Sequence, residues 1–210
     1  MTSGNLGEFA GTGQLNSFES IVDKKIYLGA KAYVESLTTD KDSYDHPTVT
    51  SGRYQLSFFP RLRTTNDIVL RALLDTSARD CRIRVAMYIW SGNKIATAER
   101  LAALERGGCD VAVILVAAKT SNKVEAVLRK ARIPMYDSGI RGQYMHAKVT
   151  TIQGKVKGVQ RSYVFTGSTN FTWSATNLNA DTVLRIESPW EVQVHSRWFD
   201  SVVEGSTRKL

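Results

Sequence analysis

Cysteine and proline are scarce in this chain of 210 residues, which contains two Cys and four Pro. Two cysteines exclude a disulfide-rich scaffold and a four-cysteine zinc site. The three histidines show no zinc spacing, so we do not expect metal catalysis. No apolar run approaches the roughly 18 residues that a membrane-spanning helix needs. The first thirteen residues have neither a basic nor an apolar region, so they predict no secretion signal.

Positive charge is what the chain has in excess. Lys and Arg number 28 against 20 Asp and Glu, which gives a formal net charge of +8. This balance favours an anionic partner. The hydrophobic content of 42% and the charged content of 23% are ordinary for a folded globular protein. The length suffices for one or two domains with a substantial core.

Strand-like and helix-like segments alternate through the middle of the chain. Apolar, β-branched and aromatic runs predict strands over 54–60, 83–90, 111–116 and 133–135. Apolar residues at helical spacing predict helices after Asn66, after Asn93 and over 121–132. This order implies right-handed crossovers. We therefore predict an α/β fold, a layered α-β-α lobe with a mixed, largely parallel sheet.

The last third of the chain has a different pattern. Tyr144–Ile152 and Ser162–Thr166 read as two strands joined by the basic loop Gln153–Arg161. Asp181–Ile186 predicts a further strand, and Pro189–Val203 predicts a helix with Pro in its first turn. Residues 38–52 are polar and turn-rich, which is typical of a linker or a loop.

The last third of the chain contains two pairs of polar residues, and the members of each pair lie two positions apart. His146 and Lys148 lie on one predicted strand, so both project from the same face. Ser168 and Asn170 follow the next strand, and pairing of the two strands would bring all four together. An imidazole can attack phosphorus or donate a proton, and the other groups can hold phosphate oxygens. Asp181, at the start of the following strand, could fix the imidazole tautomer.

The motifs H-A-K and G-S-T-N resemble the H-x-K-x-x-x-x-D and G-S-x-N signature of the phospholipase D superfamily. The resemblance runs from about Tyr54 to the C-terminus and is closest to the C-terminal half of a bacterial two-motif member. It implies a phosphohistidine mechanism that needs no metal or other cofactor, in which His146 is nucleophile or proton donor. Lys148, Ser168 and Asn170 would bind phosphate, and Asp181 would orient the imidazole. The chain departs from the signature at Gln153, where the family has Asp.

Residues near the N-terminus resemble the end of a first motif. Ser3 and Asn5 match the tail of a G-S-x-N, residues 14–16 echo 177–179, and residues 32–37 echo 197–202. We therefore expect residues 1–52 to be the tail of a first phospholipase D-like lobe plus a linker, and residues 53–210 to be the catalytic lobe. The N-terminal half of the same enzyme would complete the active site. The alternative is a homodimer in which two copies of His146 meet.

Three functions fit these features. The first is hydrolysis of a phosphatidyl headgroup ester, which the resemblance to bacterial lipases favours. The second is cleavage of DNA or RNA, which the charge and Lys155, Lys157 and Arg161 beside the motif favour. The third is a catalytically incomplete phosphate-binding lobe. The resemblance also suggests a secreted bacterial enzyme.

Several other residues are open to two interpretations. His46 and His195 are expected to be surface or packing residues. Cys81 and Cys109 open two predicted strands and could form a disulfide or stay reduced. Trp90, at the end of a predicted parallel strand, and Trp173, just after G-S-T-N, are candidates to line a substrate entrance.

Overall fold

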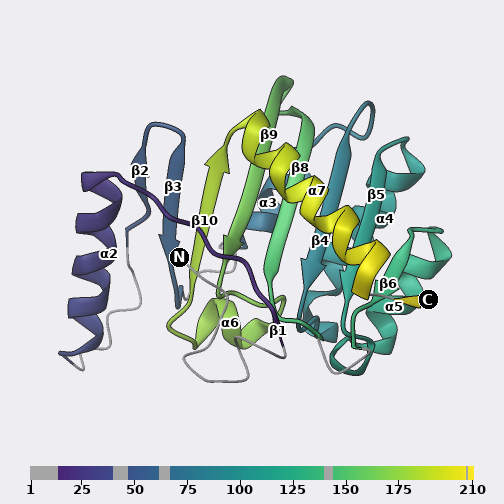
Figure 1. Cartoon of the computed structure of the whole chain (residues 1–210), viewed down its shortest axis with the longest axis horizontal. Helices are drawn as coiled ribbons and strands as arrows, with labels where there is room; N and C mark the ends of the chain where they lie inside the picture. Colours follow the sequence, from purple (N-terminus) through teal and green to yellow (C-terminus); the bar gives the residue numbers. More distant parts are fainter. Residues whose placement is uncertain (1–13, 40–46, 62–66, 140–143, 207) are drawn as a thin grey trace.

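A nine-stranded mixed sheet forms the centre of the computed structural model, which describes residues 14–39, 47–61, 67–139, 144–206 and 208–210 (Figure 1). The strand order is β11-β6-β5-β4-β8-β9-β10-β3-β2. The strands are β2 (Val49–Ser51), β3 (Tyr54–Phe58), β4 (Arg82–Met87), β5 (Asp110–Leu115), β6 (Met135–Asp137), β8 (Lys148–Val156), β9 (Val159–Gly167), β10 (Thr182–Glu187) and β11 (Arg208–Lys209). A separate parallel pair joins β1 (Gln14–Leu15) to β7 (Tyr144–Met145).

Helices cover both faces of this sheet. They are α2 (Lys24–Leu37), α3 (Ile68–Leu74), α4 (Ile95–Arg106), α5 (Asn122–Lys130), α6 (Trp173–Asn177) and α7 (Pro189–Ser206). One apolar core lies between the sheet and α3, α4 and α5. A second lies under α7, which crosses in front of the strands in Figure 1, and under α2 at one end of the sheet. Within the described residues, no helix combines the length and hydropathy that crossing a membrane requires.

The layered α/β prediction is confirmed, but parallel pairing makes up a smaller part of the sheet than predicted. Strands β4, β5 and β6 are parallel, with α4 and α5 as crossovers. From β4 through β8, β9, β10, β3 and β2 every pair is antiparallel. One of these pairs, β8 with β9, follows from the predicted loop Gln153–Arg161. The strands continue through most of it, and Lys157-Gly158 makes a tight turn, which can only join antiparallel neighbours.

Two local predictions differ from the structure. The cap of α3 is Asp67, whose carboxylate accepts a hydrogen bond from the backbone N–H of Leu70 (3.0 Å); Asn66 lies outside the described residues. Within the predicted linker 38–52, Val49–Ser51 forms the edge strand β2.

Cys81 and Cys109 lie next to neighbouring parallel strands and form a disulfide.

The register of the sheet brings four strand ends to one edge. Lys148 at the start of β8 lies opposite Met87 at the end of β4. Gly167 at the end of β9 lies opposite Val183, near the start of β10. The residues that follow β4 and β9 and precede β8 and β10 therefore meet at this edge, which we call the catalytic edge.

Candidate active site

The predicted strand 144–152 is interrupted at the proposed nucleophile. The backbone N–H groups of His146 (2.9 Å) and Ala147 (2.8 Å) both donate to the carbonyl oxygen of Leu15, which separates β7 from β8. The two side chains of the H-x-K motif still meet. Nζ of Lys148 lies 3.1 Å from Nδ1 and 3.3 Å from Nε2 of His146, and it donates to the His146 carbonyl oxygen at 2.6 Å.

Burial sets the electrostatics of this pair. His146 is 7% exposed and Lys148 is 5% exposed. Removal from water disfavours an ammonium, and burial lowers the pKa of Lys148 to about 8, although the negative charge of Asp181 acts in the opposite direction. A positive charge held with little solvation is well suited to bind phosphate oxygens.

The G-S-T-N turn approaches β10 very closely. A Cβ at Gly167 would lie 2.1 Å from the carbonyl oxygen of Thr182, so only glycine fits there. Oγ of Ser168 accepts a hydrogen bond from the Thr182 N–H (3.0 Å), which leaves its own proton free to donate. Oδ1 of Asn170 accepts from the N–H of Ile89 (3.2 Å), so its remaining donor is the side-chain NH₂ group.

Asp181 is buried at the start of the strand that follows this turn. Its carbonyl oxygen accepts from the N–H of Phe59 (2.9 Å), which ties it to the end of β3. Its negative charge acts on Lys148. The contact at Nδ1 of His146, which the sequence suggested for Asp181, comes from Asn16 in this structure. The orienting role of Asp181 therefore stays a prediction.

Asn16 is a site residue that the motifs did not reveal. Its Oδ1 lies 3.2 Å from Nδ1 of His146. An amide oxygen can only accept, so this contact is a hydrogen bond in the tautomer that has its proton on Nδ1 and its lone pair on Nε2, the atom that would attack phosphorus. The N-terminal echo at residues 14–16 drew attention to this segment, but a contact across 130 positions cannot be read from local pattern.

Tyr88 is the second such residue. Its ring lies 4.6 Å from the His146 ring, centroid to centroid, and stacks on Tyr144 at 5.4 Å. The Lys148 ammonium lies 5.3 Å from the Tyr88 centroid, within range of a cation–π contact. The available signal was its place directly after a parallel strand, where ligands commonly bind.

Gln153 lies away from these groups. It pairs with Arg82 and Ser162, five residues along β8 from Lys148, and is exposed. Five strand residues span roughly 17 Å. The departure of the chain from the family signature therefore removes no side chain from the catalytic edge.

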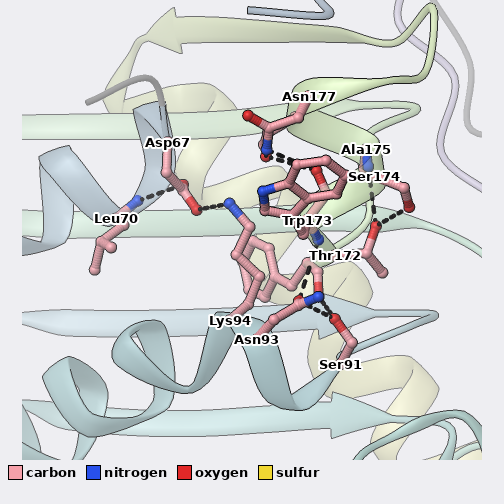
Figure 2. Close-up of polar contacts among 12 residues, drawn as sticks. Asp67, Leu70, Ser91, Asn93, Lys94, Thr172, Trp173, Ser174, Ala175 and Asn177 are labelled. Atoms are coloured by element: carbon pink, nitrogen blue, oxygen red, sulfur yellow. Dashed lines mark hydrogen bonds and ion pairs between the residues drawn. The ribbon is translucent and has the colours of Figure 1, made fainter. Parts of the chain in front are cut away.

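The loops after β4 and β9 are joined beside the site (Figure 2). Oδ1 of Asn93 accepts from the backbone N–H of Trp173 at 3.1 Å, and Lys94 pairs with Asp67 at 3.0 Å. The Trp173 side chain is 51% exposed, so it remains a candidate for a substrate entrance. Trp90 is fully buried against Phe171 and is a core residue.

The remaining candidates are not part of this cluster. Ser3, Asn5 and His46 lie outside the described residues. His195 is buried in α7 with Nε2 2.9 Å from Glu19, which agrees with the predicted packing role.

A buried imidazole lies against an ammonium in this layered α/β lobe, an arrangement that the resemblance to the phospholipase D superfamily predicts. Members of that superfamily act on phosphodiesters. A sequence model of the family described as "Cardiolipin synthase, PLD-like domain" matches residues 55–203, and the chain belongs to this family. A search of curated protein sequences found no match.

Solved structures share this fold. The phospholipase D family member Nuc from Salmonella typhimurium is 21% identical with a TM-score of 0.55, and the match covers 75% of this chain and 97% of Nuc. NucT from Helicobacter pylori is 16% identical with a TM-score of 0.52, covering 75% and 99%. Phosphatidylserine synthase from Haemophilus influenzae is 14% identical with a TM-score of 0.51, covering 91% and 48%. Identities this low establish the fold alone.

Proposed function

We propose that this protein hydrolyses a phosphodiester through a phosphohistidine intermediate. The observation that carries the proposal is the His146 ring, held by Asn16 at Nδ1 and flanked by the Lys148 ammonium. Nε2 attacks phosphorus, a P–N bond forms, and the bond from phosphorus to the leaving oxygen breaks. Water then attacks the same phosphorus and gives a proton to the group that protonated the leaving oxygen. The P–N bond breaks, and the imidazole regains its lone pair.

The phosphate oxygens are held by neighbouring groups in this scheme. Lys148 supplies the positive charge, while the Ser168 hydroxyl and the Asn170 NH₂ group donate hydrogen bonds. The negative charge of Asp181 favours the charged form of Lys148 and so opposes the effect of burial on its pKa. No step requires a metal or an organic cofactor.

A second imidazole has to protonate the leaving oxygen. Among the described residues the other histidine is His195, which is engaged by Glu19 and by the Glu191 carbonyl oxygen in α7. We propose that the acid comes from the N-terminal half of the same enzyme or from a second copy of this chain. Sedimentation of the active species separates the two, because an active homodimer would exclude the need for another half.

Two substrates are supported by different surfaces. Trp173 is 51% exposed and Leu178 is 60% exposed, on and just after α6, which follows Asn170. Such side chains can enter a lipid surface, which favours a phosphatidyl headgroup ester. The net charge of +8 favours cleavage of DNA or RNA.

The test measures choline release from phosphatidylcholine vesicles and nicking of plasmid DNA by the same preparation. His146→Ala should lower the active reaction by about 10³-fold or more, whereas His46→Ala, the matched control, should leave it unchanged. Trapping of an acid-labile phosphoryl group on the wild-type protein and its absence from His146→Ala would support the intermediate. Activity that survives His146→Ala would refute the assignment.

We also propose that the protein works in an oxidising compartment, as the expectation of a secreted enzyme implies. The Cys81–Cys109 disulfide supports this, because such bonds rarely persist where thiols are kept reduced.

A further inference from the structure

A basic cleft lies on the sheet face that carries α3, away from the His146 ring. It has a volume of about 520 Å³ and is walled by α3, β3, β9, β10 and the β8–β9 turn. Five basic side chains line it: Arg61, Arg71, Lys157, Arg161 and Arg185. Asp75 is the acidic residue of its lining. We call this feature the α3 cleft.

The positive charge of the α3 cleft is only partly neutralised. Lys157 pairs with Asp75 (3.4 Å), and Arg161 pairs with Glu187. Within the described part of the chain, Arg71 and Arg185 form no ion pair. The cleft therefore has more cationic groups than carboxylates, which favours an anionic occupant.

Arg185 has a buried donor atom without a hydrogen-bond partner and a positive charge that no described carboxylate pairs with. Its guanidinium lies over the Tyr163 ring, 4.9 Å from the centroid, on the floor of the α3 cleft. Its Nε atom is buried and has no hydrogen-bond acceptor in the described structure. A buried donor left unpaired is costly, and most such groups have a partner. An anionic oxygen in the cleft would supply charge compensation to this side chain.

The α3 cleft extends toward the catalytic edge. At one end Arg61 donates from its backbone N–H to the Thr176 carbonyl oxygen in α6 and from Nε to Phe58. The backbone N–H of Phe59 donates to the carbonyl oxygen of Asp181, which precedes β10 at the catalytic edge. At the other end lies Arg161, seven residues along β9 from Ser168. Seven strand residues span roughly 23 Å, a length that several phosphates of a nucleic-acid strand would occupy.

We propose that the α3 cleft binds the phosphate backbone of a nucleic acid while the catalytic edge acts on a neighbouring phosphodiester. This rests on the nuclease form of the proposed function. Cations distributed along a cleft fit a chain of phosphates better than a single headgroup. The two aromatic side chains of its lining, Tyr163 and Phe165, are both buried, so no exposed ring of the cleft is available for base stacking. The contacts would therefore be insensitive to sequence.

The test uses binding of a fluorescent 20-nucleotide single-stranded DNA by full-length His146→Ala protein, titrated at several salt concentrations. Arg71→Glu reverses a charge in the α3 cleft, and Lys123→Glu makes the same charge change on α5, at the other end of the sheet. Arg71→Glu should weaken binding about tenfold more than Lys123→Glu. Arg185→Gln should reduce the slope of log K against log salt concentration by about one, because one phosphate contact is lost. Thermal unfolding checks that Arg185→Gln is folded.

The outcomes separate the cleft from the catalytic function. Equal losses for Arg71→Glu and Lys123→Glu would show that net charge alone binds DNA, and would overturn the proposal. If the cleft variants lost binding to phosphatidylglycerol vesicles but kept DNA binding, the α3 cleft would bind lipid, and the proposal would be overturned. Specific DNA binding by a chain that cleaves no DNA would refute the nuclease and keep the cleft. If the protein cleaves DNA and the cleft variants bind DNA as tightly as the parent protein, the nuclease function stands and the cleft proposal is refuted.

Discussion

The two ends of strand β8 have opposite characters. At its start, Lys148 is buried against His146 and Tyr88, and burial lowers its pKa. At its far end, Gln153 is exposed beside Arg82, which pairs in solvent with Asp110 (3.5 Å) and Asp200 (3.8 Å). The fold therefore divides one sequence motif between a reactive end, which holds Lys148, and a structural end, which holds Gln153.

The structural end is held by close packing. A Cβ on Gly154 would lie 2.6 Å from Cβ of Cys81, so β8 can pass the disulfide here only as glycine. Exposed ion pairs such as those of Arg82 contribute little, about 0 to 1 kcal/mol each. We infer that the disulfide and this contact stabilise the far end, while the catalytic edge keeps poorly solvated charge.

The largest effect should come from removing the charge at the reactive end. Lys148→Met should lower activity by about 10³-fold, since a positive group that meets the charge of the transition state is lost. The free energy of unfolding should fall as well, because the buried Asp181 carboxylate loses a compensating charge and the His146 carbonyl oxygen loses its donor. The matched control is Lys155→Met, on the same strand but exposed, which should change activity less than twofold. Equal losses in both variants would remove the distinction between the two ends.

The pH profile sharpens the same prediction. Lys148 binds phosphate when protonated, and burial brings its pKa from 10.5 down to about 8. Activity should therefore fall as pH rises through about 8, by about tenfold per pH unit, rather than near 10.5. The residual activity of Lys148→Met should show no such fall. Assays between pH 6.5 and 10 check this.

The second effect concerns stability at the structural end. Replacing Cys81 and Cys109 together by Ala removes a cross-link between residues 28 positions apart. The free energy of unfolding should drop by about 3 kcal/mol, and the melting temperature by roughly 10 °C. Activity at 20 °C should stay within about twofold of the wild type, since the disulfide lies beside Gly154, six residues along β8 from Lys148. Calorimetry measures the stability and the assay measures the activity of one preparation. A large loss of activity in folded protein would contradict the separation of the reactive end from the structural end.

The sequence predicted what depends on local pattern. The pattern of Val111–Val116 predicted a buried strand, and the spacing of His146 and Lys148 predicted that their side chains lie together. The convergence of Ser168 and Asn170 with them stays a prediction. Pairing over long distances was not accessible. The contact of Asn16 with His146 and the interruption of the strand by Leu15 both depend on a segment about 130 residues away. The antiparallel pairing of β4 with β8 and of β10 with β3 likewise joins segments that are distant in the sequence.

The smallest effect should come from Gln153, the position at which the chain departs from its family. Gln153→Asp restores the carboxylate of the signature beside Arg82, and Gln153→Ala removes the amide. Because this residue lies roughly 17 Å from Lys148 along the strand, both variants should keep activity within about twofold. Gln153→Asp should raise stability by less than about 1 kcal/mol, the usual contribution of an exposed ion pair. A tenfold or larger gain in activity for Gln153→Asp alone would show that the two ends of β8 are coupled. The reactive end could then no longer be treated as complete without its carboxylate.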